Sequence, residues 1–311
     1  MINLSVDRKK KYVYHENLWA EVKKNKIAYI YISPFYILYG IFGAFPLLFA
    51  FYLTFHNWDG ISNMTFVGLQ NYMFLFKDPL FWKSLYNTLV IAIVAHVPML
   101  FLALVLAYIL NSKMIKLKNF FRTIYFTPVV TSSVAVSLVF LTLYGVHYGL
   151  INVFLQYIGL KPIDWFGGNG FWIKPAIIIL FIWRWLGWNM VIYYAGLQSI
   201  PVEITEAAVV DGANSFQTFF KVIIPLIMPI ILYTVIMSTI GGLTIFDEPF
   251  MLVGPDGGTN NSGLTLSTYL YSQAFRFSHF GYAATFGFVI SALIVIFSFI
   301  NMKIFGNDYT K

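Results

Sequence analysis

Three carboxylate residues, Glu203, Glu206 and Asp211, lie close together in the most polar stretch between two strongly apolar ones. Clustered carboxylates can act as general acids and bases or as metal ligands when other suitable groups complete the site. No histidine or cysteine lies nearby, and the chain's histidines are scattered, with no pair at the i, i+4 spacing of a helical zinc site. We therefore expect neither a catalytic site nor a metal site, and we interpret this stretch as a surface.

The segment around these carboxylates is predicted to form two short helices joined at a glycine. Pro201 suits the first turn of a helix, where two glutamates then place negative charge near the positive end of the helix dipole. Gly212 can adopt the left-handed conformation that ends a helix, and Asn214 or Ser215 can cap the next one. Small residues on one face, followed by phenylalanines, are typical of a docking element. The alternative is a solvated hairpin that only links two apolar segments.

The overall composition is that of an integral membrane protein. Of 311 residues, 59% are hydrophobic, 20% are aromatic and 11% are charged, whereas about a quarter of the residues in soluble domains are charged. The chain has no cysteine, which excludes disulfides, a thiol nucleophile and cysteine-based metal sites. Its net charge of +7 comes from Lys and Arg beside apolar runs. This placement indicates membrane orientation, and we expect no nucleic-acid binding.

Apolar stretches long enough to cross a membrane dominate the chain. A spanning helix needs roughly 20 apolar residues, and the first such run lacks the small-residue cleavage site of a signal peptide, so we expect it to remain as a span. The sequence thus predicts an all-α polytopic membrane protein with six transmembrane helices. We expect a basic tail at 1–27, able to form an interfacial helix or stay disordered, a transmembrane domain at 28–305 and a short tail at 306–311. The expected spans are 28–55, 85–111, 123–146, 172–195, 226–252 and 283–305.

The distribution of Lys and Arg between the connecting segments predicts the orientation of these spans. The N-terminal tail and the loop 112–122 are rich in Lys and Arg, whereas the loops 56–84, 147–171 and 253–282 carry few. Positive loops remain on the cytoplasmic side. Both termini and the polar segment 197–225 are therefore predicted to be cytoplasmic.

One long string in this polar segment resembles a known family. Residues 206–229, EAAVVDGANSFQTFFKVIIPLIMP, resemble the EAA loop of ABC importer permeases, and in particular the maltose-type, carbohydrate-uptake branch. Val222 and Ile224 depart conservatively from the isoleucine and leucine that are usual there. The strings FVGLQNY at 66–72 and FRT at 121–123 also resemble elements of that branch. Matching pieces extend from about residue 30 to residue 300 and exclude the basic tail.

The resemblance implies that the segment 197–225 is a coupling loop that docks in a cleft of a cytoplasmic ATPase. The chain lacks the Gly-rich phosphate loop ending in Gly-Lys-Ser/Thr, so we expect ATP and magnesium to be bound by that ATPase and no cofactor here. The implied partners are two ATPase subunits, a second homologous permease, an extracytoplasmic sugar-binding protein and the sugar or oligosaccharide, in a cell membrane. The residues implied to couple to the ATPase are Glu206, Ala207, Ala208, Asp211, Gly212, Phe216, Phe219 and Phe220.

A transport path requires polar groups at bilayer depth, where they are costly unless they face a pathway or another chain. Trp188 and Asn189, one turn after Arg184, could form a sugar-binding surface of aromatic and hydrogen-bonding groups, although the tryptophans could instead be interfacial and the arginine could pair with a neighbouring subunit. Asp247 and Glu248, near the outer end of the fifth span, could contact the substrate or the protein that delivers it, but a solvated span end is the favoured interpretation. Mapped through the resemblance, the path is implied to include Ser133, Leu186, Gly187, Trp188, Asn189, Met190, Ser238, Gly241 and Gly242, with the last two favoured as packing or hinge glycines.

Three alternative functions follow from the same composition. An ABC permease for another solute, such as an amino acid or phosphate, would share the coupling loop. A secondary carrier or channel would need no ATPase and usually shows an internal repeat, which is not evident in this sequence. A membrane-embedded transferase would require clustered acidic or histidine residues at an interface. The strings at 66–72 and 206–229 favour the sugar permease.

Overall fold

The computed structural model describes residues 22–112 and 114–306. The predicted basic tail therefore lies almost entirely outside the described residues. The chain divides into two units, residues 1–52 and residues 53–311, and each is described by itself.

The first unit is a single long apolar helix with one irregular turn. The run Lys26–Leu53 is one of the helices long and apolar enough to cross a membrane. No residue of its first helical segment is buried. Pro34 lies inside this segment. A π turn precedes Pro46, which is consistent with the local irregularity that proline introduces into spanning helices. The segments are α2 (Lys26–Tyr39), η1 (Gly40–Ala44) and α3 (Phe45–Leu53).

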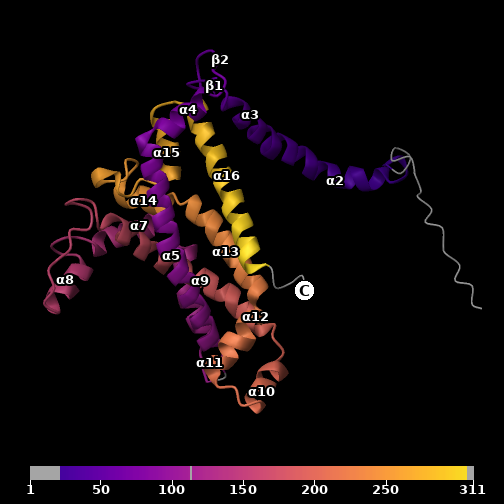
Figure 1. Cartoon of the computed structure of the whole chain (residues 1–311), viewed down its shortest axis with the longest axis vertical. Helices are drawn as coiled ribbons and strands as arrows, with labels where there is room; N and C mark the ends of the chain where they lie inside the picture. The colour runs from indigo at the N-terminus through magenta and orange to yellow at the C-terminus, as the bar shows by residue number, and fades with distance from the viewer. Residues whose placement is uncertain (1–21, 113, 307–311) are drawn as a thin grey trace, which may run out of the picture. The chain divides into compact units, whose positions relative to one another are not determined.

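The second unit is built around long apolar helices that pack side by side (Figure 1). The longest of them begins with a proline in its first turn, and the Asp78 carboxylate caps it by accepting a hydrogen bond from the Leu80 amide at 2.8 Å. This helix packs against the most enclosed span, and both contribute to the buried apolar core. The helices are α5 (Pro79–Asn111), α9 (Ile173–Gln198), α13 (Met228–Leu243) and α16 (Phe280–Phe305).

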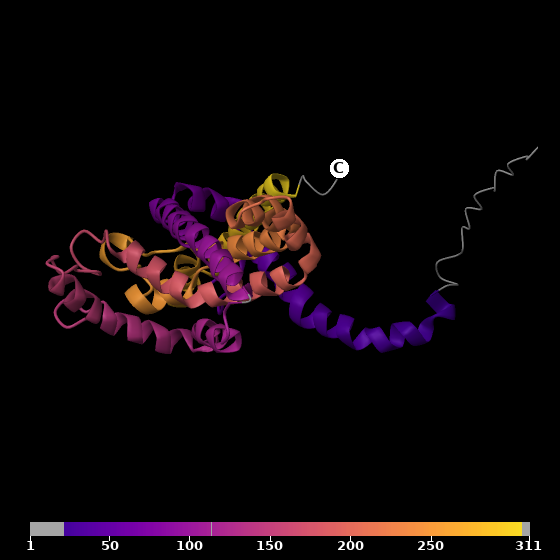
Figure 2. The same cartoon turned by 90° about the horizontal axis from the view of Figure 1, so that it is seen from below.

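The predicted third span, 123–146, is not a straight helix. Helix α6 (Lys118–Val130) and helix α7 (Ser133–Leu143) meet at a bend of 96°. Pro128 cannot donate a backbone hydrogen bond and lies one turn before the break, and Thr131 is extended, which ends α6. In the described residues, five helices are long and apolar enough to cross a membrane, or up to six if this bent pair forms one span. Figure 2 shows α6, α7 and α8 (Leu150–Tyr157) along one side of the second unit.

The two ends of the second unit differ in character (Figure 1). At one end, the Asn71 side chain donates to the carbonyl oxygens of Thr54 and His56, and the hydroxyls of Tyr269 and Tyr282 donate to Asp78. These bonds tie together several short elements: the hairpin β1 (His56–Asn57) and β2 (Thr65–Phe66), α4 (Gln70–Lys77) and α15 (Leu266–Tyr271). The other end carries α10 (Val202–Val210), α11 (Ser215–Thr218), η2 (Phe219–Ile223) and α12 (Ile224–Leu226).

Candidate functional site

The glycine elbow between α10 and α11 has the geometry that the sequence predicts. Gly212 has a positive φ of 82°, and its amide donates to the Val209 carbonyl at 3.0 Å. The Ala213 amide donates to the Ala208 carbonyl at 2.9 Å, which completes a Schellman C-cap. No neighbour lies within 4 Å of a Cβ added at Gly212. Glycine is therefore required by the backbone conformation and not by crowding.

The second short helix begins with a complete capping box. The Asn214 side chain accepts from the Gln217 amide at 2.8 Å, and the Gln217 side chain accepts from the Asn214 amide at 2.9 Å. Both ends of the elbow therefore have their backbone groups satisfied locally. The backbone turn of the elbow is therefore set by residues close together in the sequence.

The elbow presents an apolar surface to its surroundings and anchors itself through one phenylalanine. Val210 and Phe216 are 86% and 71% exposed. Phe219, by contrast, is buried, and its ring centre lies 4.7 Å from that of Tyr108 on α5. Of the residues implied to couple to an ATPase, Ala208 is half-buried, Phe219 is buried, and those exposed are Glu206, Ala207, Asp211, Gly212, Phe216 and Phe220.

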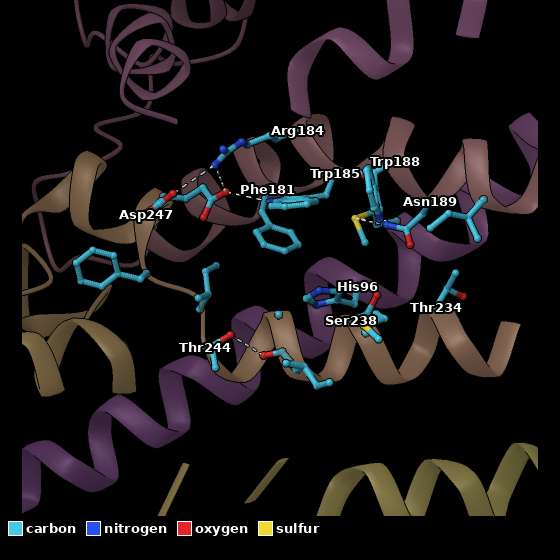
Figure 3. Close-up of a pocket in the computed structure, with 18 residues that line it drawn as sticks. His96, Phe181, Arg184, Trp185, Trp188, Asn189, Thr234, Ser238, Thr244 and Asp247 are labelled. Atoms are coloured by element: carbon cyan, nitrogen blue, oxygen red, sulfur yellow. Dashed lines mark hydrogen bonds and ion pairs between the residues drawn. The ribbon is translucent and has the colours of Figure 1, made fainter. Parts of the chain in front are cut away.

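A cavity of about 430 Å³ lies between α9, α13 and the middle of α5 (Figure 3). Trp188 and Asn189 line it from α9, Ser238 and Gly241 line it from α13, and His96 lines it from α5. The structure thus places Trp188 and Asn189, which the sequence singles out, beside Ser238 and Gly241. These two positions lie more than 40 residues further along the chain. The remaining wall is mainly apolar, which is usual for a small-molecule site.

Arg184 forms a buried ion pair at one end of this cavity. Its Nη1 lies 2.9 Å from Glu248 Oε1 and 3.9 Å from Asp247 Oδ2, and the Trp185 indole also donates to Glu248 Oε1 at 3.2 Å. Arg184 and Glu248 are only 9% and 4% exposed. The interpretation of Glu248 as part of a solvated span end is therefore wrong, because the carboxylate is neutralised by an arginine within the same chain. Asp247 is half-exposed, as a span end would be.

Asp247 and Glu248 lie where a predicted span is interrupted. The run 228–253 passes as one candidate span, but residues Thr244–Phe246 are not helical, and α14 (Asp247–Val253) begins after them. Irregular backbone at membrane depth is tolerated only where it is buried in protein or lines a cavity. Residues 244–246 line the cavity, so the break satisfies this condition.

The other residues implied to line the path lie outside the cavity. Gly187 touches the backbone of Tyr125, so it allows α9 to pack closely on α6. Gly242 packs in the same way, since an added Cβ would lie 2.8 Å from the Ala92 Cβ. An added Cβ at Gly241, however, meets nothing within 4 Å. Leu186 is half-buried, Met190 is buried in the core, and Ser133 lies at the start of α7 beside the bend.

Sequence reasoning did not single out several residues of the cavity wall. His96 lines it, with Nδ1 2.7 Å from the Ala92 carbonyl oxygen, and so do Thr234 and Thr244. Thr234 Oγ1 lies 2.6 Å from the Tyr193 hydroxyl. A lone histidine within an apolar run is the one available signal, because polar residues at bilayer depth commonly mark a pathway.

The fold and the site together define a multi-pass membrane transport component. Apolar helices surround a partly polar cavity at mid-helix depth, and an ordered apolar elbow projects from one end of the bundle. The chain belongs to the family described as the binding-protein-dependent transport system inner membrane component, whose model matches residues 100–309. This range includes the elbow and nearly all of the cavity wall. The family consists of permease subunits, so the chain is a transport subunit and not an enzyme.

Curated relatives cover nearly the whole chain. A lactose transport system permease protein, LacF, from Rhizobium radiobacter is 39% identical over 275 residues, which are 88% of this chain and 91% of the relative. An arabinooligosaccharides transport system permease protein, AraP, from Bacillus subtilis is 32% identical over 294 residues, covering 93% and 92%. A multiple sugar-binding transport system permease protein, MsmF, from Streptococcus mutans is 38% identical over 270 residues, covering 86% and 91%.

Solved structures share the fold. A chain of a bacterial ABC transporter that imports the acidic polysaccharide alginate superposes with a TM-score of 0.81 at 23% identity, over 95% of this chain and 100% of that one. A chain from the alginate transporter in complex with its alginate pentasaccharide-bound periplasmic protein gives a TM-score of 0.77 at 23% identity, over 92% and 96%. The all-α permease fold expected from the sequence is thus confirmed.

Proposed function

We propose that this chain is a transmembrane permease subunit of an ABC importer that moves a sugar or oligosaccharide across the cell membrane. A separate ATPase supplies the energy, and an extracytoplasmic solute-binding protein delivers the substrate. The names of the lactose, arabinooligosaccharide and multiple-sugar relatives support the substrate class. The alginate transporter solved with a periplasmic protein supports the delivery step.

The observation that carries this proposal is the rigid, exposed elbow with a buried anchor. Val209, Val210 and Phe216 are large apolar side chains exposed on the elbow, and exposed apolar side chains that gather together mark interaction sites. Phe219 links the elbow to Tyr108 on α5. A partner that moves the elbow therefore moves α5, a helix that lines the cavity through His96. Binding at one end of the bundle is in this way coupled to the substrate path.

The cavity suits an uncharged sugar better than an acidic one. Among the residues that the structure describes, Arg184 is the only Lys or Arg in the cavity wall, and Glu248 already neutralises it. Asp247 adds a half-exposed negative charge. A uronate would therefore face a carboxylate without a free cation, which is unfavourable in a partly buried site. Trp188, which is 43% exposed, and the Asn189 amide can supply a stacking surface and hydrogen bonds for sugar hydroxyls.

The proposed orientation places both termini and the elbow in the cytoplasm, with the end that carries β1, β2 and α15 outside. The charge distribution of the connecting segments supports this orientation. One such chain is proposed to supply half of the pathway and a second, similar permease the other half. Two ATPase subunits are proposed to bind the elbows and to carry the ATP and magnesium sites.

Two substitutions in the elbow test the proposal. Glu206→Lys reverses a charge on the exposed surface of α10, and Gly212→Pro excludes the φ of 82° that the elbow requires. Both should abolish uptake and substrate-stimulated ATP hydrolysis in the complex purified with its neighbouring gene products, while membrane insertion stays intact. An oligosaccharide panel, both neutral and uronic, should stimulate the wild-type ATPase only with neutral members.

The chain offers a matched control for backbone strain. Gly159 has a φ of 83° and open space around it, and its amide donates to the Gln156 carbonyl, so Gly159→Pro introduces the same local disturbance in a loop proposed to be outside. This variant should retain coupled hydrolysis. Normal uptake by both elbow variants would refute the docking role. Uptake by this chain alone in vesicles would favour a secondary carrier instead.

A further inference from the structure

A second cavity, of about 550 Å³, lies near the end of the bundle that carries the elbow. It is formed where α5 ends and α6 begins, and α9 supplies its other wall. The Tyr194 ring on that wall belongs to the same buried core as Phe219, the anchor of the elbow. The residues that line it are Ile115, Lys116, Leu117, Lys118, Asn119, Phe120, Arg122, Tyr194 and Gln198.

The cavity is strongly basic. Lys116, Lys118 and Arg122 line it, and no carboxylate of residues 22–112 or 114–306 does. Within the described part of the chain, none of the three forms an ion pair: Lys118 Nζ donates to the Asn111 carbonyl at 3.1 Å, and Lys116 is exposed. Three cations around one hollow repel one another, and an anion bound between them would relieve that repulsion.

Arg122 is held in place without using its main hydrogen-bonding capacity. Its guanidinium carbon lies 5.0 Å from the centre of the Tyr194 ring, and the Gln198 amide donates to the hydroxyl of that tyrosine at 3.1 Å. Arg122 Nη1 makes only a long contact of 3.5 Å with Asn119 Oδ1, and Nε is enclosed without a partner. Stacking therefore orients the guanidinium, while its terminal nitrogens keep donors for an anion such as phosphate, whose oxygens match the planar fork of an arginine.

The surroundings of the cavity indicate the form in which that phosphate arrives. Leu117 and Phe120 are 63% and 57% exposed beside the basic residues. The cavity adjoins the end of α5, a candidate membrane span, and therefore lies near the boundary between lipid and water. Basic pockets between spanning helices are suited to acidic lipid headgroups, and exposed apolar side chains beside them can contact acyl chains.

We propose that this cavity binds the phosphate of an anionic phospholipid headgroup through Lys116, Lys118 and Arg122. A bound headgroup would brace the start of α6 against Tyr194 on α9, in the same core that holds the elbow. The site depends only on the geometry of this chain and stands whichever solute is transported.

The test is lipid retention by the full-length chain, measured by native mass spectrometry from micelles doped with phosphatidylglycerol or phosphatidylcholine. Wild type should retain phosphatidylglycerol in preference to phosphatidylcholine. Neutralising one cation, as in Arg122→Gln or Lys116→Gln, should weaken retention about fivefold, and neutralising all three about a hundredfold. Lys303→Gln removes an exposed positive charge from the last turn of α16, outside the cavity, and should leave retention unchanged.

Three results would overturn the proposal. Equal retention of phosphatidylglycerol by wild type and by the variant with all three cations neutralised would show that these cations do not bind the lipid. Full displacement of the lipid by millimolar inorganic phosphate would assign the cavity to free phosphate. Unchanged lipid retention together with loss of ATPase co-purification in the triple variant would assign these cations to a protein contact. Arg122→Lys conserves the charge but not the guanidinium. Partial retention of phosphatidylglycerol by this variant, together with loss of retention by Arg122→Gln, would support a headgroup contact.

Discussion

The elbow between α10 and α11 and the cavity beside α9 are organised by opposite means. The elbow is exposed, and its shape comes from hydrogen bonds between residues close in sequence, such as the Asn214 and Gln217 capping box. The cavity lies between helices, and its charged end comes from Arg184 and Glu248, which lie 64 positions apart. Local hydrogen bonds therefore determine the shape of the elbow, which is proposed to bind the ATPase. Long-range side-chain pairing determines the structure of the cavity, which is proposed to bind the substrate.

This difference predicts that the elbow tolerates side-chain changes that the bundle does not, and Phe219 is where the two meet. Phe219→Ala empties a buried position against Tyr108 and should lower the free energy of unfolding by about 3–5 kcal/mol. Phe216→Ala, at a position 71% exposed, should change it by less than about 0.5 kcal/mol yet reduce substrate-stimulated ATPase activity. Thermal unfolding of the purified chain and ATPase assays of the complex measure both effects. Equal destabilisation by the two variants would mean that the elbow is part of the core.

The next prediction concerns the buried charges of the cavity. Glu248→Leu removes the short ion pair of Arg184 and leaves the longer contact to Asp247, at 3.9 Å, so it should destabilise the chain by roughly 3 kcal/mol. The double variant Arg184→Leu/Glu248→Leu removes both charges and should recover most of that loss. Asp247→Asn, at the half-exposed position, should cost less than about 1 kcal/mol. If the double variant were less stable than Glu248→Leu, Arg184 would stabilise the chain without Glu248, and the loss in the single variant would not be the cost of an orphaned charge.

The sequence predicts the elbow well because its structure is encoded locally. Gly212 and Asn214 adopt the predicted roles of helix end and helix cap, and each role depends on residues within a few positions. The apolar runs likewise predict the spanning helices, since their length and composition suffice. Even there, the bend of 96° between α6 and α7 is not encoded by hydropathy, because the two helices taken together still have the length and composition of one span.

The cavity is predicted only in part, because its residues are brought together by tertiary packing. Trp188, Asn189 and Ser238 were expected to share a path, and they line one cavity. The partnership of Arg184 with Glu248 could not be predicted, because nothing in the sequence pairs two residues on different helices. Whether a residue of α9 lines the cavity depends on the face of the helix on which it lies. Met190 follows Asn189 directly but is buried in the core.

Neighbouring glycines on α13 provide a test within a single helix turn. An added Cβ at Gly242 would lie 2.8 Å from Ala92 Cβ and 2.9 Å from His96 Cε1, so Gly242→Ala should cost about 2 kcal/mol through overpacking. Gly241 has open space on the cavity side, and Gly241→Ala should be neutral or gain up to about 1 kcal/mol from helix propensity. The alanine at 241 should instead alter the apparent KM for uptake, since it narrows the cavity. Similar unfolding midpoints for both variants would contradict the packing role of Gly242.

The smallest effect is expected where the elbow depends on a single cap. Asn214→Ala removes the acceptor for the Gln217 amide and should cost about 1 kcal/mol of local helix stability. Because α11 is short and lies at the end of the bundle, this loss should appear as faster hydrogen exchange at 215–218 and leave the global unfolding midpoint unchanged. Asn214→Asp keeps a capping oxygen and serves as the control. A global shift in the unfolding midpoint for Asn214→Ala would show that the elbow unfolds together with the bundle. The structure of the elbow could then not be treated as local and independent of the long-range packing of the helices.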